Sequence, residues 1–244
     1  MRLIDKIIVI TGASRGIGRA LACGFAAEGA IVVASARTVR PGTGMREGSL
    51  EETIQTITAA GGKAVAFPCD VAEEGQIKAL VERTLAEVGP VDTLVNNAAY
   101  LRAGPILDFD VADWDGVMAT NVRGPFLTCK YFLPTMIERN RGSIINISSH
   151  TAIRSDPDTP VYGASKAALD RFTLNLAIDV AGFNIAVNAL RPGRIASHSW
   201  GDEFGRIPSP PEVVIPPVLW LAQQDASTFT GHVVHRDEFG KTWP

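Results

Sequence analysis

Short apolar runs alternate with segments of helical hydrophobic spacing along the whole chain, and this alternation constrains the fold more than any other feature of the sequence. The runs are apolar on both faces, as expected for strands with no side facing water. They lie at residues 6–11, 30–36, 63–67, 91–95, 143–147, 185–190 and 231–235. The segments between them place apolar residues at helical spacing, as Ile17, Leu21 and Phe25 do. The pattern predicts an α/β fold, a doubly wound parallel sheet with helices on both faces.

Two longer helices are expected at residues 112–139 and 162–180. A further apolar helix is expected at residues 211–223, with a kink at Pro216-Pro217. No repeat or low-complexity linker divides the chain, so we predict a single domain over residues 1–244. Ligands bind such sheets at the carboxyl ends of the strands, so the loops there are the place to look for chemistry.

Composition excludes several classes of protein. With 46% hydrophobic residues and a formal charge of −3, the chain can bury a core and is not disordered. With a pI of about 5.8 the chain is net negative at neutral pH, which disfavours binding to the phosphates of nucleic acids. No apolar run is long enough to span a membrane. Cys23, Cys69 and Cys129 are too dispersed for a disulfide framework or a zinc site. We therefore expect a cytoplasmic protein without a bound metal ion, a nucleic-acid partner or a membrane partner.

A glycine-rich loop follows the first predicted strand. It reads Thr11-Gly-Ala-Ser-Arg-Gly-Ile-Gly18, with Ser14, Arg15 and Ile17 between the glycines. Gly12, Gly16 and Gly18 lie where the strand turns into a helix, so the backbone can approach a pyrophosphate at the helix N-terminus. A tight turn without a ligand is the alternative, and the position after the first strand favours a dinucleotide site.

The second predicted strand ends at Ser35-Ala-Arg37, without the acidic residue that usually holds the ribose 2′-hydroxyl of NAD. Ser35, Arg37 and the loop residue Arg15 instead suit a 2′-phosphate, since guanidinium groups make charge-assisted hydrogen bonds to phosphate. The alternative is that both arginines are ordinary solvated charges. We predict that NADP(H) is preferred over NAD(H).

Tyr162 and Lys166 are four residues apart at the start of a predicted helix, so their side chains share one face. A phenol has a pKa of about 10, and a nearby ammonium should lower the pKa of Tyr162 toward the range of acid–base catalysis. The alternative is a surface pair. Ser149 follows another predicted strand and could donate a hydrogen bond to a substrate oxygen.

The order of these motifs resembles the short-chain dehydrogenase/reductase family, of the classical type, along essentially the whole chain. Further matches are Asp70-Val71, Asn96-Asn97-Ala98-Ala99, Asn121 and Arg191-Pro192-Gly193-Arg194-Ile195. The resemblance implies a single NAD(P)-binding Rossmann-type domain with a substrate loop or lid at about residues 195–210. It also implies a homo-oligomer, either a dimer or a tetramer.

The resemblance also implies residue roles. Tyr162 would be the general acid or base, and Lys166 would lower the pKa of Tyr162 and bind the nicotinamide ribose. Ser149 would polarise the substrate oxygen, and Asn121 would hold a water. The implied cofactor-binding residues are Gly12, Ser14, Arg15, Gly16, Ile17, Gly18, Ser35, Arg37, Asp70, Val71, Asn97, Ala98, Tyr162, Lys166, Pro192, Gly193 and Ile195.

Other features depart from the family pattern or are open to two interpretations. The last predicted strand ends in residues 235–240 instead of Asp-Gly-Gly, which makes the subunit contacts uncertain. His232 and His235 would face opposite sides of a strand, so they are a poor metal pair. The substrate-contact candidates, chosen by their loop positions, are His150, Ile153, Tyr100 and Trp200.

The predicted function is hydride transfer between NADP(H) and a small carbonyl or alcohol substrate, by an alcohol dehydrogenase or carbonyl reductase. The first alternative is a 3-oxoacyl thioester reductase. The second is a non-catalytic NADP(H)-binding regulator on the same fold, because fold does not fix function.

Overall fold

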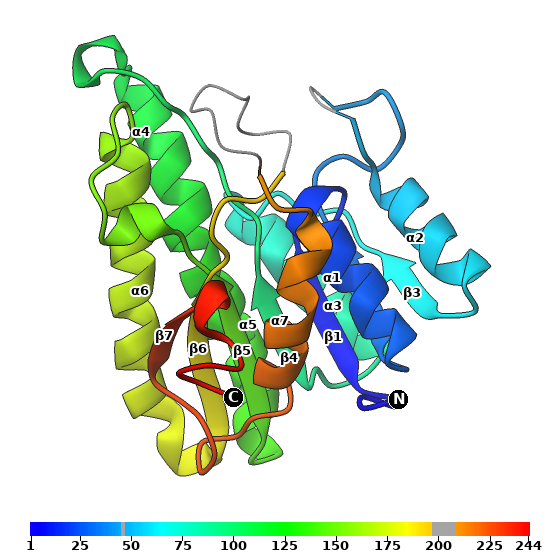
Figure 1. Ribbon diagram of the computed structural model, residues 1–244. Helices are drawn as coiled ribbons and strands as arrows, with labels where there is room; N and C mark the ends of the chain where they lie inside the picture. Colours follow the sequence, from blue (N-terminus) through cyan, green and yellow to red (C-terminus); the bar gives the residue numbers. More distant parts are fainter. Residues whose placement is uncertain (45–46, 197–207) are drawn as a thin grey trace.

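The computed structural model describes residues 1–44, 47–196 and 208–244, and within them the strands form one parallel sheet (Figure 1). The strands are β1 (Ile7–Thr11), β2 (Ile31–Ser35), β3 (Lys63–Ala66), β4 (Thr93–Asn96), β5 (Gly142–Ile147), β6 (Ile185–Arg191) and β7 (His232–His235). Their order is β3-β2-β1-β4-β5-β6-β7, with every neighbouring pair parallel. The predicted doubly wound sheet is confirmed. The strand order reverses direction between β1 and β4, which is where such sheets bind ligands.

Helices cover both faces of this sheet (Figure 1). The α-helices are α1 (Gly16–Ala27), α2 (Leu50–Ala59), α3 (Glu74–Glu87), α4 (Val111–Met118), α5 (Gly124–Glu138), α6 (Pro160–Val180) and α7 (Ile215–Leu221). The shorter turns are η1 (Ile106–Asp108), η2 (Ala119–Arg123), η3 (His150–Ala152), η4 (Ala181–Phe183), η5 (Pro211–Val214) and η6 (Arg236–Glu238). Helices α1, α2 and α7 pack on one face, and α3, α5 and α6 pack on the other.

The two cores follow from the alternation of side chains along each strand. In β1, Ile8 and Ile10 contribute to the core under α1 and α7, whereas Ile7 and Val9 contribute to the core under α3 and α5. Each of these four side chains is buried, because the strand has no face in water. This rigid centre holds the loops at the carboxyl edge of the sheet in place. In the described part of the chain, no helix is both long and apolar enough to cross a bilayer.

Two helix predictions differ from the structure. The helix expected at residues 112–139 is interrupted by η2, a turn of π-helix between α4 and α5. The kink expected at Pro216-Pro217 is wrong, because both prolines lie in the first turn of α7, after the 3₁₀ turn η5. Proline is tolerated in a first helical turn, where its missing N–H would have no partner within the helix.

Candidate active site

A cavity of about 800 Å³ opens at the carboxyl edge of the sheet, between the loops after β1, β4, β5 and β6. It brings together most of the residues selected from the sequence. These are Gly12, Ser14, Arg15, Gly16, Ile17, Arg37, Asp70, Val71, Asn97, Ala98, Ser149, His150, Tyr162, Lys166, Pro192, Gly193 and Ile195. Gly18, Ser35, Tyr100, Asn121 and Ile153 do not line it. Trp200 and most of the predicted lid lie outside the described residues.

The glycine loop forms a backbone cradle at one end of the cavity. A Cβ atom on Gly12 would lie 2.8 Å from the Cα of Ala98, and one on Gly18 would lie 2.2 Å from the Gly12 carbonyl oxygen. The Asn97 amide donates hydrogen bonds to the carbonyl oxygens of Thr11 (2.9 Å) and Gly12 (3.2 Å), which fixes the loop to β4. Helix α1 begins beside it with no acidic residue in its first turn and no side-chain cap. The free N–H groups and the helix dipole suit an anionic group such as a pyrophosphate.

At the end of the cavity beside Arg37 and Asp70, the residues differ from the sequence prediction. The Arg37 side chain is 69% exposed and lies 3.6 Å from the Asp70 carboxylate, so an acidic residue does reach this region, from the loop after β3. Ser35 is fully buried beside Cys69 and does not itself line the cavity, although Cys69 does. It shares a strand face with Val33, which packs in the core under α3 and α5, and alternation along β2 therefore turns Ser35 inward.

The other end of the cavity holds Ser149, Tyr162 and Lys166. Ser149 precedes the 3₁₀ turn η3, where its Oγ accepts hydrogen bonds from the Thr151 backbone N–H (3.3 Å) and hydroxyl (3.0 Å). Ser149 is also hydrogen-bonded to Tyr162, in the first turn of α6. One turn further on, the Lys166 ammonium lies 5.7 Å from the centre of the Tyr162 ring and donates to the Ile147 carbonyl oxygen at 2.9 Å. Three of the four predicted catalytic side chains, those of Ser149, Tyr162 and Lys166, therefore share one end of the cavity.

Burial dominates the acid–base properties of this group. It raises the pKa of Tyr162 to about 12, and the hydrogen bond with Ser149 only partly opposes this. It lowers the pKa of Lys166 to about 8, against the attraction of the Asp170 carboxylate. The expected lowering of the Tyr162 pKa is therefore wrong for the free protein, in which the Lys166 ammonium bonds a backbone carbonyl.

Asn121 lies beneath the residues that line the cavity and does not line it itself. It is fully buried in the π-helical turn η2, and its neighbour Thr120 lines the cavity instead. Its amide oxygen accepts from the Tyr100 N–H (2.8 Å), and its amide nitrogen donates to the Tyr100 carbonyl (3.0 Å) and to Ser165 Oγ (3.0 Å). Ser165 donates in turn to the Tyr162 carbonyl oxygen at 2.7 Å. Asn121 thereby joins the loop after β4 to the first turn of α6.

Of the substrate candidates among the described residues, His150 lines the cavity, whereas Tyr100 and Ile153 do not. His150 lines the cavity directly after Ser149. Tyr100 donates its phenol hydrogen to Asp113 at 3.2 Å, and Ile153 is 66% exposed outside the cavity. Arg236 and Asp237, which follow β7, also line the cavity, whereas their segment was expected to affect only the subunit contacts. The departure from Asp-Gly-Gly at this segment was the signal that could have identified them.

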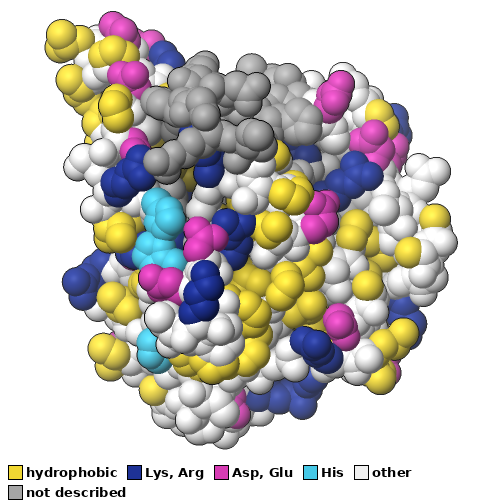
Figure 2. Space-filling view, viewed as in Figure 1, with side chains coloured by type: hydrophobic (Ala, Val, Ile, Leu, Met, Phe, Trp, Pro, Cys, Tyr) yellow, Lys and Arg dark blue, Asp and Glu magenta, His cyan; other side chains and the backbone are white. Residues whose placement is uncertain are grey.

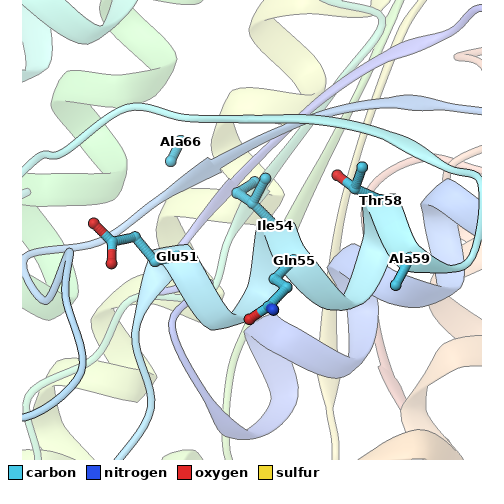
Figure 3. A pocket seen from close by; sticks show the side chains of 6 residues that line it. All are labelled: Glu51, Ile54, Gln55, Thr58, Ala59 and Ala66. Carbon is cyan, nitrogen blue, oxygen red and sulfur yellow. The ribbon is translucent and has the colours of Figure 1, made fainter.

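A second hollow, of about 500 Å³, lies away from these groups, against α2 (Figure 3). It is lined by Glu51, Ile54, Gln55, Thr58, Ala59 and Ala66. Its lining is almost entirely apolar or uncharged, and it contains none of the candidate catalytic residues. We assign it no part in the site.

The motifs and their arrangement match a known family. The family model described as "short chain dehydrogenase" matches residues 6–204. The chain belongs to this family. Among curated relatives, 3-oxoacyl-[acyl-carrier-protein] reductase FabG of Thermotoga maritima is 34% identical over 97% of this chain and 98% of the relative. The 2-dehydro-3-deoxy-D-gluconate 5-dehydrogenase of Formosa agariphila is 30% identical over 95% of this chain and 91% of the relative.

Solved structures of other short-chain dehydrogenases have the same fold. A protein of Beutenbergia cavernae, described as an NAD(P)-dependent gluconate 5-dehydrogenase with bound NADP, superposes with a TM-score of 0.87 at 29% identity. The match covers 96% of each chain. A metagenomic short-chain oxidoreductase in complex with NADP gives a TM-score of 0.82 at 33% identity, over 96% of this chain and 98% of the other. The chain is thus an oxidoreductase-family member along nearly its whole length.

Proposed function

We propose that this short-chain dehydrogenase transfers hydride between NADP(H) and a small carbonyl or alcohol substrate, as a carbonyl reductase or alcohol dehydrogenase. The observation that carries the proposal is the shared cavity, which has the glycine cradle at one end and Ser149, Tyr162 and Lys166 at the other. A bound nicotinamide would supply or accept the hydride, and the protein would supply position and electrostatics. We further propose a single domain over residues 1–244, a dimeric or tetrameric assembly, and a cytoplasmic location.

Each polar group in the cavity has a proposed task. Ser149 and Tyr162 would both donate hydrogen bonds to the substrate oxygen, and Tyr162 would give that oxygen its proton during reduction. Lys166, with a pKa of about 8, would carry a charge near neutral pH and attract negative charge on the Tyr162 oxygen. Asn121 would position the first turn of α6 and hold a water near Lys166.

Tyr162→Phe tests the mechanism. We expect turnover to fall by a factor of about 10² to 10⁴, the usual contribution of a general acid or base. Binding of NADPH, followed by its fluorescence, should be retained because the glycine cradle is unchanged. Turnover near that of the wild type would contradict the proposed role of Tyr162.

The preference for NADP(H) is supported by Arg15 and Arg37 at the cavity wall and by the relatives crystallised with NADP. Asp70 opposes it, because its carboxylate lies beside Arg37. Arg37→Asp should therefore shift the ratio of kcat/KM for NADPH and NADH toward NADH. Arg40→Asp is the control, since Arg40 is exposed, pairs with Glu51 and does not line the cavity. Equal ratios in both variants would contradict the role of Arg37.

A second candidate is a 3-oxoacyl thioester reductase, which is favoured by the similarity to 3-oxoacyl-[acyl-carrier-protein] reductases. A panel of acyl thioesters and simple ketones distinguishes the two. Reduction of thioesters with a far higher kcat/KM would support this candidate, and reduction of ketones alone would exclude it.

A further inference from the structure

A chain of polar side chains leads from the cavity into the protein behind Ser149. Its members are His150, His235, Arg191 and Asp170, and only His150 lines the cavity. Figure 2 shows two adjoining histidine side chains on this face, with basic and acidic side chains around them. The proposed catalytic mechanism uses neither His235 nor Asp170.

The sheet brings this chain together. Arg191 and His235 are the last residues of β6 and β7 and stand opposite each other in the strand register. The Arg191 Nη1 lies 3.1 Å from His235 Nε2, and its Nε and Nη2 donate to Asp170 at 3.2 and 2.6 Å. The His235 Nδ1 contacts the His150 Nε2, with the two ring centres 4.4 Å apart. Asp170 belongs to α6, one turn after Lys166.

The hydrogen-bonding capacity of each group determines which ring nitrogen of His235 and of His150 carries a hydrogen. An arginine guanidinium only donates, so the Nε2 of His235 must accept. A neutral His235 therefore carries its hydrogen on Nδ1 and donates it to His150. The Nε2 of His150 must then accept, which leaves the hydrogen of a neutral His150 on its Nδ1.

The charges around His150 favour its neutral form. Burial, the neighbouring His235 ring and the guanidinium groups of Arg191 and Arg154 lower the pKa of His150, and only Asp237 opposes them. A neutral His150 with a fixed tautomer presents a hydrogen-bond donor whose place in the ring does not vary. Such a donor can distinguish a substrate that offers an acceptor oxygen at this position from one that lacks it.

We propose that His150 orients the substrate, that the chain His235–Arg191–Asp170 sets its tautomer, and that the site thereby selects carbonyl substrates with a second acceptor oxygen close to the reacting carbonyl. That oxygen belongs to a hydroxyl, carbonyl or carboxylate group. The proposal rests on the proposed reductase function. His235, Arg191 and Asp170 are positioning residues, because they act through His150.

Two substitutions of His235 separate the hydrogen-bonding role from a merely structural one. His235→Asn keeps an N–H group near the position of Nδ1 and can still donate to His150. His235→Gln places its amide near the position of Nε2, where it can accept from Arg191 but no longer donates to His150. The matched control is His232→Gln, on the same strand, since His232 is exposed and stacks on Phe229 away from the cavity.

The experiment compares kcat/KM for an α-hydroxy ketone with that for the same ketone lacking the hydroxyl group. Wild type, His235→Asn and His232→Gln should retain the preference for the hydroxy ketone. In His235→Gln and His150→Leu, the ratio of kcat/KM for the hydroxy ketone to kcat/KM for the plain ketone should fall about tenfold, the effect of one hydrogen bond. Unfolding temperatures confirm that each variant is folded.

Equal losses for both ketones in His235→Gln, or equal behaviour of the Asn and Gln variants, would overturn the tautomer proposal and leave the reductase function intact. If wild type reduces neither ketone nor other carbonyl compounds, the proposed function fails, and this proposal fails with it.

Discussion

Asp170→Ala should destabilise this protein far more than the loss of an exposed ion pair. The Asp170 and Arg191 side chains are each only 10% exposed, and one Asp170 oxygen accepts two hydrogen bonds from Arg191. Removing the carboxylate leaves a buried guanidinium without its counter-charge, which typically costs about 3–5 kcal/mol. A chain of 244 residues has an unfolding entropy of about 0.5 kcal/mol/K, so the expected fall in Tm is about 6–10 °C.

Calorimetry or circular dichroism at neutral pH and fixed protein concentration measures this difference. Glu87→Ala is the control, because Glu87 pairs with Arg83 at 2.9 Å on the exposed surface of α3 and its loss should leave Tm nearly unchanged. The double variant Asp170→Leu/Arg191→Met should recover most of the lost stability, since it leaves no buried charge. A fall in Tm for Asp170→Ala no larger than that of the control would refute the reasoning.

Two further substitutions test the cradle and the buried lysine. Gly18→Ala should abolish NADPH binding, because its Cβ would lie 2.2 Å from the Gly12 carbonyl oxygen, whereas Gly75→Ala has open space and should bind normally in a fluorescence titration. The Lys166 pKa is lowered from 10.5 to about 8, so the folded state binds fewer protons than the unfolded state between these values and wild-type stability should rise with pH there. In denaturant titrations, the free energy of unfolding of wild type should therefore rise relative to that of Lys166→Met between pH 8 and 10. A difference in free energy that does not change with pH would contradict the burial of a charged Lys166.

The strands and the glycine loop were predictable because they depend on local patterns. All seven predicted strands lie within a few residues of those observed in the described chain, since an apolar run between turns has few other structures available. The helix break at η2 was not predictable, because nothing in the local sequence distinguishes a π turn from the α-helix around it. The prolines of α7 were misassigned because α7 begins at Ile215, four residues after the expected start, so that Pro216 and Pro217 lie in its first turn.

The site was predictable where a motif fixes the spacing and less so where tertiary contacts decide. Ser149 and Tyr162 meet because a short turn and a helix start connect them. Ser35 was expected to help hold a 2′-phosphate but is fully buried, because the facing of a strand residue depends on its packing neighbours. The contact between His150 and His235 joins residues 85 positions apart and depends on the register of β6 and β7, which no local pattern reveals.

The π turn η2 has a consequence for how this family member can change by insertion and deletion. A π turn accommodates one more residue than an α-helical turn of the same height, so α4, η2 and α5 form a continuous helical segment with a local bulge. Deleting one residue of η2 would remove the bulge and restore regular helical hydrogen bonding, with α4 and α5 in nearly the same relative orientation, but it would change the facing of the residues within η2 itself. Asn121 would then leave Tyr100 and Ser165. A mutation that makes this helix more regular is therefore expected to break the connection between the loop after β4 and the first turn of α6.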